Sequence, residues 1–174
     1  SLTSVAHLEE AIMSTPSPED FARFAAQTQQ RIDDLVEKGS WLVVFVGADK
    51  QTTPPTPGFS YTVGLTEHGL PELVIAALPP DVAHGTLNQI GALMRKNGPF
   101  KNGDISYEVL QGNFRVAFVD LPGGALPIAN ARYGADDYHA LQVFWPDPNV
   151  RLPWEPDIQQ RLFGVGLVAP RRGA

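Results

Sequence analysis

Side chains that could bind a ligand or transfer a proton are concentrated in two segments of the chain. The first segment, residues 59–73, carries Tyr61, Thr62, His68 and Glu72 in the sequence FSYTVGLTEHGLPEL. An imidazole has an unperturbed pKa of ~6.5, so His68 could take up and release a proton near neutral pH. We therefore predict that His68 transfers protons and that Glu72 orients it or balances its charge, with Tyr61 and Thr62 binding the ligand.

The second segment, residues 133–147, reads YGADDYHALQVFWPD and carries a similar mixture of phenol, imidazole, amide and carboxylate groups. If its centre is helical, Tyr138 and Gln142 share one face, because they are four residues apart. Small-molecule pockets combine apolar walls with a few convergent polar groups, and the two segments together provide both. We predict a pocket between the 61–72 turn and this segment, where the further ligand-binding residues are Tyr138, His139, Gln142 and Asp147.

Both segments also have a purely structural interpretation. In the first, His68 is a solvated residue of a turn, and Glu72 caps the turn or pairs with a neighbour. In the second, the polar groups are satisfied inside a packed C-terminal lobe, where Gln142 or Asp147 bonds a buried phenol or indole. A buried polar group without a partner costs ~1–3 kcal/mol. We therefore expect the two segments to be spatial neighbours that satisfy each other's hydrogen bonds.

Several kinds of site are excluded by composition and spacing. The chain has no cysteine, so disulfides, thiolate metal sites and iron–sulfur clusters are impossible. The four histidines are scattered, and Pro71 disfavours the helix that would make His68 and Glu72 a metal-binding pair. Neither a glycine-rich phosphate loop nor the G-x-S-x-G motif is present. The sequence thus predicts no bound transition metal, and it identifies no cofactor.

Composition and charge indicate the class of protein. Of the 174 residues, 43% are apolar and 18% are charged, which is typical of a globular chain. The net charge of −6 argues against a nucleic-acid partner, since phosphate binding needs a concentrated basic surface. Without a long apolar run or a signal peptide, we expect a cytoplasmic protein that does not contact a membrane. We expect tails at 1–16 and 171–174 around one domain at 17–170.

Hydrophobic periodicity predicts the elements that must position the two segments. Apolar residues at steps of three and four predict a helix over 18–38, and the continuous apolar run 41–46 predicts a strand buried on both faces. Short connections favour antiparallel neighbours, so we predict an α+β fold: a mainly antiparallel sheet of about five strands with helices packed on one face. The proline-rich loop 49–58 is predicted to be the most mobile internal segment. The other expected elements are strands at 59–63 and 73–78, a helix at 80–96, a hairpin of 105–110 and 114–121, a break at 121–127, a helix at 136–141 or alternatively a strand at 142–145, and a helix at 157–162.

Several strings of residues resemble the motifs of one protein family. They are Tyr61-Thr62-Val63-Gly64-Leu65, His68-Gly69-Leu70-Pro71-Glu72-Leu73, Leu141-Gln142-Val143-Phe144-Trp145-Pro146-Asp147, Pro153-Trp154 and the Trp-headed strand 41–46. Taken together, they resemble a bacterial family known as domain of unknown function 4262, over roughly residues 40–160. The loop before Phe59 is longer and richer in proline than the family pattern, and Pro148-Asn149 replace the acid expected after Asp147. The resemblance implies the limits of the domain and a site made of two segments, and it carries no established activity.

Two functions are compatible with these observations. The first is a small-molecule-binding domain or a small enzyme, for which His68 and Asp147 should open into one concave pocket. The second is a non-catalytic interaction or homodimerisation module that uses an aromatic C-terminal lobe. In that case, Trp145 and Trp154 should lie on a flat exposed patch. The aromatic residues of this lobe are Phe144, Trp145, Trp154 and Phe163.

Overall fold

The computed structural model describes residues 17–51, 53, 57–112, 114–122, 124–147 and 149–154. The expected tails, the 157–162 helix, Phe163 and the centre of the 49–58 loop lie outside these residues. The elements in chain order are α1 (Pro18–Glu37), β1 (Leu42–Val46), β2 (Phe59–Val63), a 3-10 turn η1 (Thr66–His68), β3 (Glu72–Ala76), α2 (Pro80–Asn97), β4 (Ile105–Ser106), β5 (Val116–Leu121), α3 (Pro127–Tyr133) and β6 (Ala140–Phe144).

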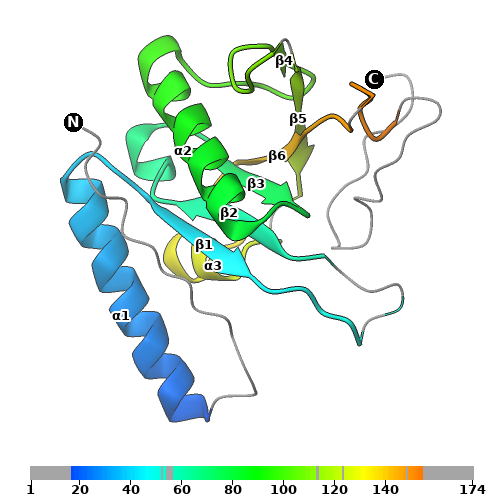
Figure 1. Ribbon diagram of the computed structural model, residues 1–174. Helices are drawn as coiled ribbons and strands as arrows, with labels where there is room; N and C mark the ends of the chain where they lie inside the picture. The colour runs from blue at the N-terminus through cyan, green and yellow to red at the C-terminus, as the bar shows by residue number, and fades with distance from the viewer. Residues whose placement is uncertain are drawn as a thin grey trace.

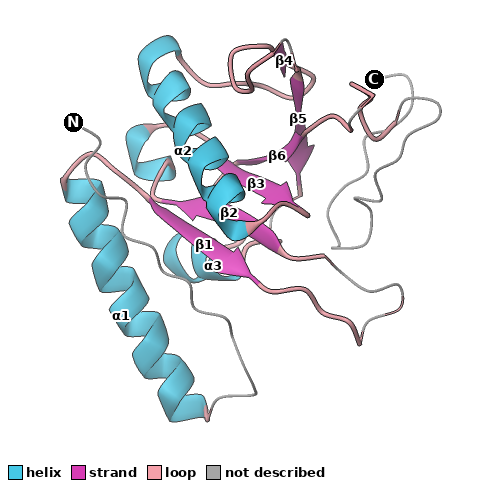
Figure 2. Cartoon of the chain, viewed as in Figure 1, coloured by secondary structure: helices cyan, strands magenta, loops and turns pink. Residues whose placement is uncertain are grey.

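The described strands form one sheet in the order β1-β2-β3-β6-β5-β4 (Figures 1 and 2). Neighbouring strands are antiparallel except β3 and β6, which run parallel. The predicted α+β class is confirmed, although the sheet has six strands rather than about five and is mixed. The parallel pair is possible because the long connection from β3 to β6 returns the chain to the same end of the sheet.

Helices cover both faces of the sheet, so the prediction of helices on one face was wrong. Strand side chains alternate between faces. One set packs with α2, and the other packs with α1 and α3 (Figure 1). The apolar run 41–46 predicted a strand buried on both faces, which agrees with this arrangement. In the structure Val43 faces α2, while Leu42 faces the other helices. The two cores are represented by Trp41, Val43, Leu73, Ile75, Leu87 and Ile90 on the α2 side, and by Ile32, Leu42, Tyr61, Val63, Val74 and Ala129 on the opposite side.

The first two long helices lie where periodicity predicts them. Ser17 caps α1 by accepting a hydrogen bond from the Asp20 backbone N–H at 3.1 Å, and Gly39 after the helix has a positive φ of 78°. On the other face of the sheet, α2 approaches β1 closely at Gly91, where an added Cβ would lie 2.6 Å from the Trp41 ring. The Trp41 indole also donates to Asn88 Oδ1 at 3.0 Å. Glycine at position 91 therefore lets the helix and the indole pack together.

The region 121–144 differs most from the sequence prediction. The expected break at 121–127 is followed at once by α3. The helix expected at 136–141 is absent, and 140–144 is strand, which agrees with the alternative of a strand at 142–145. Pro127, which the prediction treated as part of the break, occupies the first turn of α3, where its missing N–H costs nothing. In the predicted hairpin, β5 is confirmed, but the strand that pairs with it is only Ile105–Ser106. The short strand β4 therefore leaves most of 107–112 as loop.

Candidate functional site

The two polar segments are direct neighbours in the structure, as predicted. Glu72 pairs with Ala140 and Leu73 with Leu141 along the parallel strands β3 and β6. The Glu72 backbone N–H also donates to the His139 carbonyl at 2.8 Å. Because the two strands run in the same direction, the residues that precede them emerge at the same edge of the sheet. Residues 66–71 and 136–139 therefore lie side by side.

An open depression with a volume of about 890 Å³ lies between these residues. One side is formed by Thr66 and residues 69–71, and the other by residues 136–139. Residues 99–102, which follow α2, and Asp120 on β5 complete the wall. Inside this wall the His139 Nε2 lies 3.1 Å from Asp120 Oδ1, and both side chains are exposed. The depression thus combines charged side chains with apolar ones, and of the predicted ligand-binding residues it contains Tyr138 and His139.

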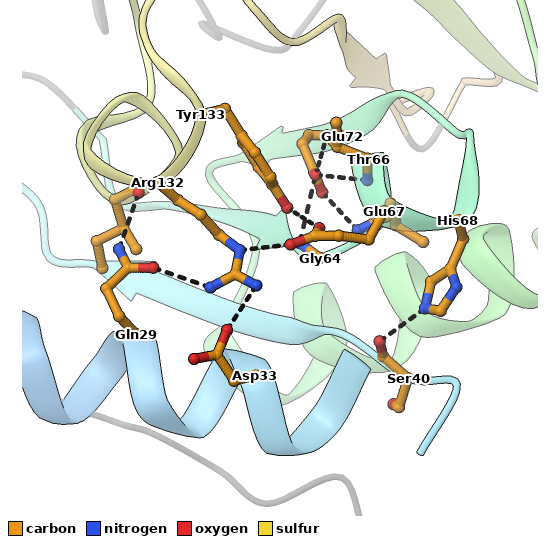
Figure 3. Close-up of polar contacts among 12 residues, drawn as sticks. Gln29, Asp33, Ser40, Gly64, Thr66, Glu67, His68, Glu72, Arg132 and Tyr133 are labelled. Carbon is orange, nitrogen blue, oxygen red and sulfur yellow. Dashed lines mark hydrogen bonds and ion pairs between the residues drawn. The ribbon is translucent and has the colours of Figure 1, made fainter. Parts of the chain in front are cut away.

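Glu72 lies beneath the turn, with no solvent exposure. Its carboxylate accepts backbone N–H groups of Gly64, Leu65 and Thr66 at 3.3, 3.2 and 2.9 Å, and the hydroxyls of Thr62 and Thr66 at 2.9 and 2.5 Å (Figure 3). Burial raises the pKa of Glu72, and the hydrogen bonds from Thr66, Thr62 and Leu65 oppose that shift. Donors on both oxygens hold the β2–β3 turn in one conformation.

His68 and Thr62 also take part in building this turn. The His68 Nε2 lies 3.0 Å from the Ser40 carbonyl oxygen before β1, and Figure 3 shows the imidazole directed at Ser40. Thr62 is fully buried, donates to Glu72 and accepts the Leu73 backbone N–H at 2.8 Å. His68 is half-buried and is absent from the wall of the depression. The structure thus directs His68 and Glu72 to different partners and not to each other.

The two tyrosines among the predicted site residues hold the N-terminus of α3. The hydroxyl of Tyr61 accepts the Ile128 backbone N–H at 3.3 Å, and that of Tyr138 accepts the Leu126 N–H at 3.3 Å. Tyr138 also donates to Asn130 Oδ1 at 2.6 Å. These bonds replace the side-chain cap that α3 lacks. Burial raises the pKa of Tyr61 to about 12. The expectation that the two segments satisfy each other's polar groups is therefore confirmed only in part. Tyr133 of the second segment donates to Glu67 of the first, whereas Tyr61 and Tyr138 find their partners at α3.

Gln142 and Asp147 lie away from the depression. Gln142 is buried in the middle of β6, and its Oε1 has no hydrogen-bond partner among the described residues. Asp147 is buried beyond the far end of β6, where it accepts the backbone N–H groups of Asn149 and Arg151, each at 2.9 Å. His68 and Asp147 therefore do not open into one pocket, which corrects the predicted form of the site.

The tryptophans of the C-terminal lobe do not form a flat exposed patch. Trp145 is partly buried and donates its indole N–H to the Ala76 carbonyl at 3.0 Å. Trp154 packs edge-on against the buried Phe144, with ring centroids 5.4 Å apart. Both indoles thus pack against buried core residues, and the geometry expected of the aromatic interaction surface is not observed at these two residues.

A cluster of charged side chains that sequence reasoning missed joins α1, η1 and α3 (Figure 3). Arg132 lies 2.5 Å from Glu67 and 2.8 Å from Asp33, and it donates to Gln29 Oε1 at 3.1 Å. Tyr133 donates its hydroxyl to Glu67, and burial together with this bond raises the pKa of Tyr133. Glu67 belongs to a recognised motif, but its partner Arg132 is 65 residues away and offers no local signal.

Two further properties of the described residues bear on the class of site. None of the helices within them is long and apolar enough to cross a membrane. In the same part of the chain, no three histidine, aspartate or glutamate side chains are grouped so that they could hold a metal ion. What the geometry offers is hydrogen-bonding and charged groups at an open surface.

Comparisons with known proteins agree with the motif resemblance. No curated protein and no solved structure gave a significant match to this chain. The model of a family described as Domain of unknown function (DUF4262) matches residues 35–159. The match begins near the end of α1 and includes the whole sheet, the β2–β3 turn and the walls of the depression. The chain belongs to the DUF4262 family.

Proposed function

We propose that the protein binds a polar small molecule in the depression between the β2–β3 turn and residues 136–139. The observation that carries this proposal is that two motifs, far apart in sequence, form opposite walls of one concavity that contains charged side chains. Ligand sites commonly lie on loops that a rigid scaffold positions. Here the buried carboxylate of Glu72 fixes one loop, and the parallel pairing of β3 with β6 places the other beside it.

The charges of the wall favour a ligand that carries a positive group. Three carboxylates, those of Asp120, Asp136 and Asp137, face the depression, against the ammonium of Lys101 and the imidazole of His139. His139 beside Asp120 could also exchange a hydrogen bond with the ligand. We assign His68 and Glu72 to construction of the turn, because Glu72 is fully buried and His68 bonds Ser40. The proposal is therefore binding, with no proton transfer assigned to His68.

A ligand screen with site-directed controls tests this proposal. A thermal-shift screen of small amines, amino acids and sugars should yield a stabilising compound, since a ligand at a hundred times its Kd adds ~2.7 kcal/mol. Amide chemical shifts should then change at residues 100–102, 120 and 136–139. The double substitution Asp120→Asn with Asp136→Asn should weaken binding at least tenfold. Asp34→Asn, at an exposed position of α1, should not.

Two results would contradict the proposal. The first is that the shifts produced by the compound map to another face of the molecule. The second is that the double substitution and the Asp34→Asn control bind the compound equally well. Either outcome would remove the depression as the binding site while leaving the fold intact.

A further inference from the structure

A second concavity, lined in part by α3, has a different chemistry. It lies between the N-terminal half of α1, the strands β1 and β2, and α3, with a volume of about 190 Å³. Phe24 and Ala25 approach from α1, Phe59 and Tyr61 from β2, and Ile128 from α3. Its wall shares no residue with that of the depression. The two concavities therefore require separate explanations.

The polar groups that line this pocket already have partners inside the protein. The hydroxyl of Thr28 donates to the Phe24 carbonyl at 2.8 Å, as a helical threonine often does. The Tyr61 hydroxyl accepts the Ile128 N–H at 3.3 Å. The Gln29 amide donates to the Ile128 carbonyl at 3.4 Å and accepts from Arg132 at 3.1 Å. With these groups occupied, the pocket offers an entering molecule little besides hydrocarbon and aromatic surface.

The size and surroundings of the pocket restrict what could fill it. An apolar cavity of ~150 Å³ stays free of water and binds benzene, so about 190 Å³ fits one substituted aromatic ring or a short alkyl chain. Arg132, the cation bonded to Gln29 of this wall, is already paired with the carboxylates of Asp33 and Glu67. An acidic headgroup would therefore have to compete with two fixed carboxylates. These observations favour a neutral ligand.

Phe21 marks the edge of the pocket. It lines the pocket on the first turns of α1, and 56% of its surface is exposed. An apolar molecule in the pocket would cover part of this ring and remove it from water. We propose that the space between α1, β1–β2 and α3 is a binding site for a small neutral apolar molecule of the size of one aromatic ring.

Methyl NMR of the full chain with toluene as the probe tests the proposal. Toluene should shift the methyl signals of Val46 and Ile128 in a saturable manner, while benzoate, of similar size but charged, should not. Ala25→Leu adds three carbons to the pocket wall and should weaken toluene binding at least tenfold. Ala26→Leu places the same side chain on an exposed position one residue further along α1 and should leave binding within twofold.

The outcomes are distinct even if a variant is altered in stability. The thermal unfolding midpoint of each variant shows whether it is folded, and Ala25→Leu is expected to match or exceed the wild type because it fills space. Failure of toluene to shift the Val46 and Ile128 signals in the wild-type chain overturns the proposal, including the case in which another part of the chain occupies the pocket. Equal binding to the Ala25→Leu and Ala26→Leu variants also overturns it.

Discussion

Glu72 shows how a residue can be recognised from the sequence while its role stays open between proton transfer and capping of the turn, and the structure supports the cap. The sequence identifies an acid beside a histidine in a glycine-bounded turn, which is a pattern compatible with proton transfer. The structure surrounds this acid with five donors, three of them backbone N–H groups of the turn. Sequence alone could not establish this, because the number of donors depends on how the backbone of residues 64–66 is folded around the carboxylate.

Replacement of Glu72 by glutamine should therefore destabilise the protein. The amide nitrogen would face at least one backbone N–H group that now bonds a carboxylate oxygen, and a buried donor without a partner costs ~1–3 kcal/mol. Urea unfolding of Glu72→Gln should show this loss. Glu37→Gln, at an exposed position of α1, should change stability by no more than ~0.5 kcal/mol. Equal stability of the two variants would show that the carboxylate does not hold the turn.

The pKa of Tyr61 predicts a loss of stability in alkali. Burial raises this pKa from 10.0 to about 12, so above pH 10 the unfolded chain releases the proton more readily than the folded chain. Stability from this group is complete below pH 10 and falls as the pH rises towards 12, by ~2–3 kcal/mol. Denaturant unfolding between pH 9 and 12 should show a shallower decline for Tyr61→Phe than for the wild type.

The exposed Tyr107 provides the control for this experiment. Tyr107→Phe should keep the alkaline decline of the wild-type protein. Tyr133 and Tyr138 also have raised pKa values, so Tyr61→Phe should reduce the decline without abolishing it. If stability falls with pH in Tyr61→Phe as steeply as in the wild type, ionisation of Tyr61 is not a cause of the loss of stability in alkali.

At the scale of elements, periodicity and caps predict what local sequence determines. The helix predicted over 18–38 is α1, and the strands predicted at 41–46 and 59–63 are β1 and β2 within one residue. Between residues 121 and 144 the prediction missed α3 and left helix and strand as alternatives before residue 145, because tertiary contacts determine the structure there. The N-terminus of α3 depends on hydroxyls from Tyr61 and Tyr138, and β6 is a strand because β3 and β5 pair with it on both sides.

The contact between α2 and β1 predicts opposite effects for two alanine substitutions in one helix. Gly91→Ala would place a Cβ 2.6 Å from the Trp41 ring, and overpacking of this kind costs ~1–3 kcal/mol. Gly85 lies in the same helix with nothing within 4 Å of an added Cβ, so Gly85→Ala should stabilise by ~0.5–1 kcal/mol. Thermal unfolding of both variants measures the difference. A stabilised Gly91→Ala would show that the indole can move away at no cost.

At the scale of the whole molecule, the sequence located part of the candidate site. The two motifs could be expected to meet, since each concentrates polar groups, and they do so through β3 and β6. The remaining walls could not be predicted, because residues 99–102 and Asp120 come from a loop and a strand without any chemical motif. The charged cluster of Glu67, Arg132 and Asp33 likewise depends on contacts across three elements. Contacts of this kind depend on how the topology brings separate elements together.

The parallel pairing of β3 with β6 also has a consequence for how the chain folds during synthesis. Strands β1 to β3 and helix α2 are complete by residue 97, and their contacts are close in sequence. One edge of β3, a strand rich in apolar side chains, has no partner strand until residues 140–144 have left the ribosome. A newly made chain therefore passes through a stage with an open hydrophobic strand edge, which invites aggregation. The pairing of β3 with β6 joins segments that are far apart in sequence. We expect it to be the step that limits the folding rate.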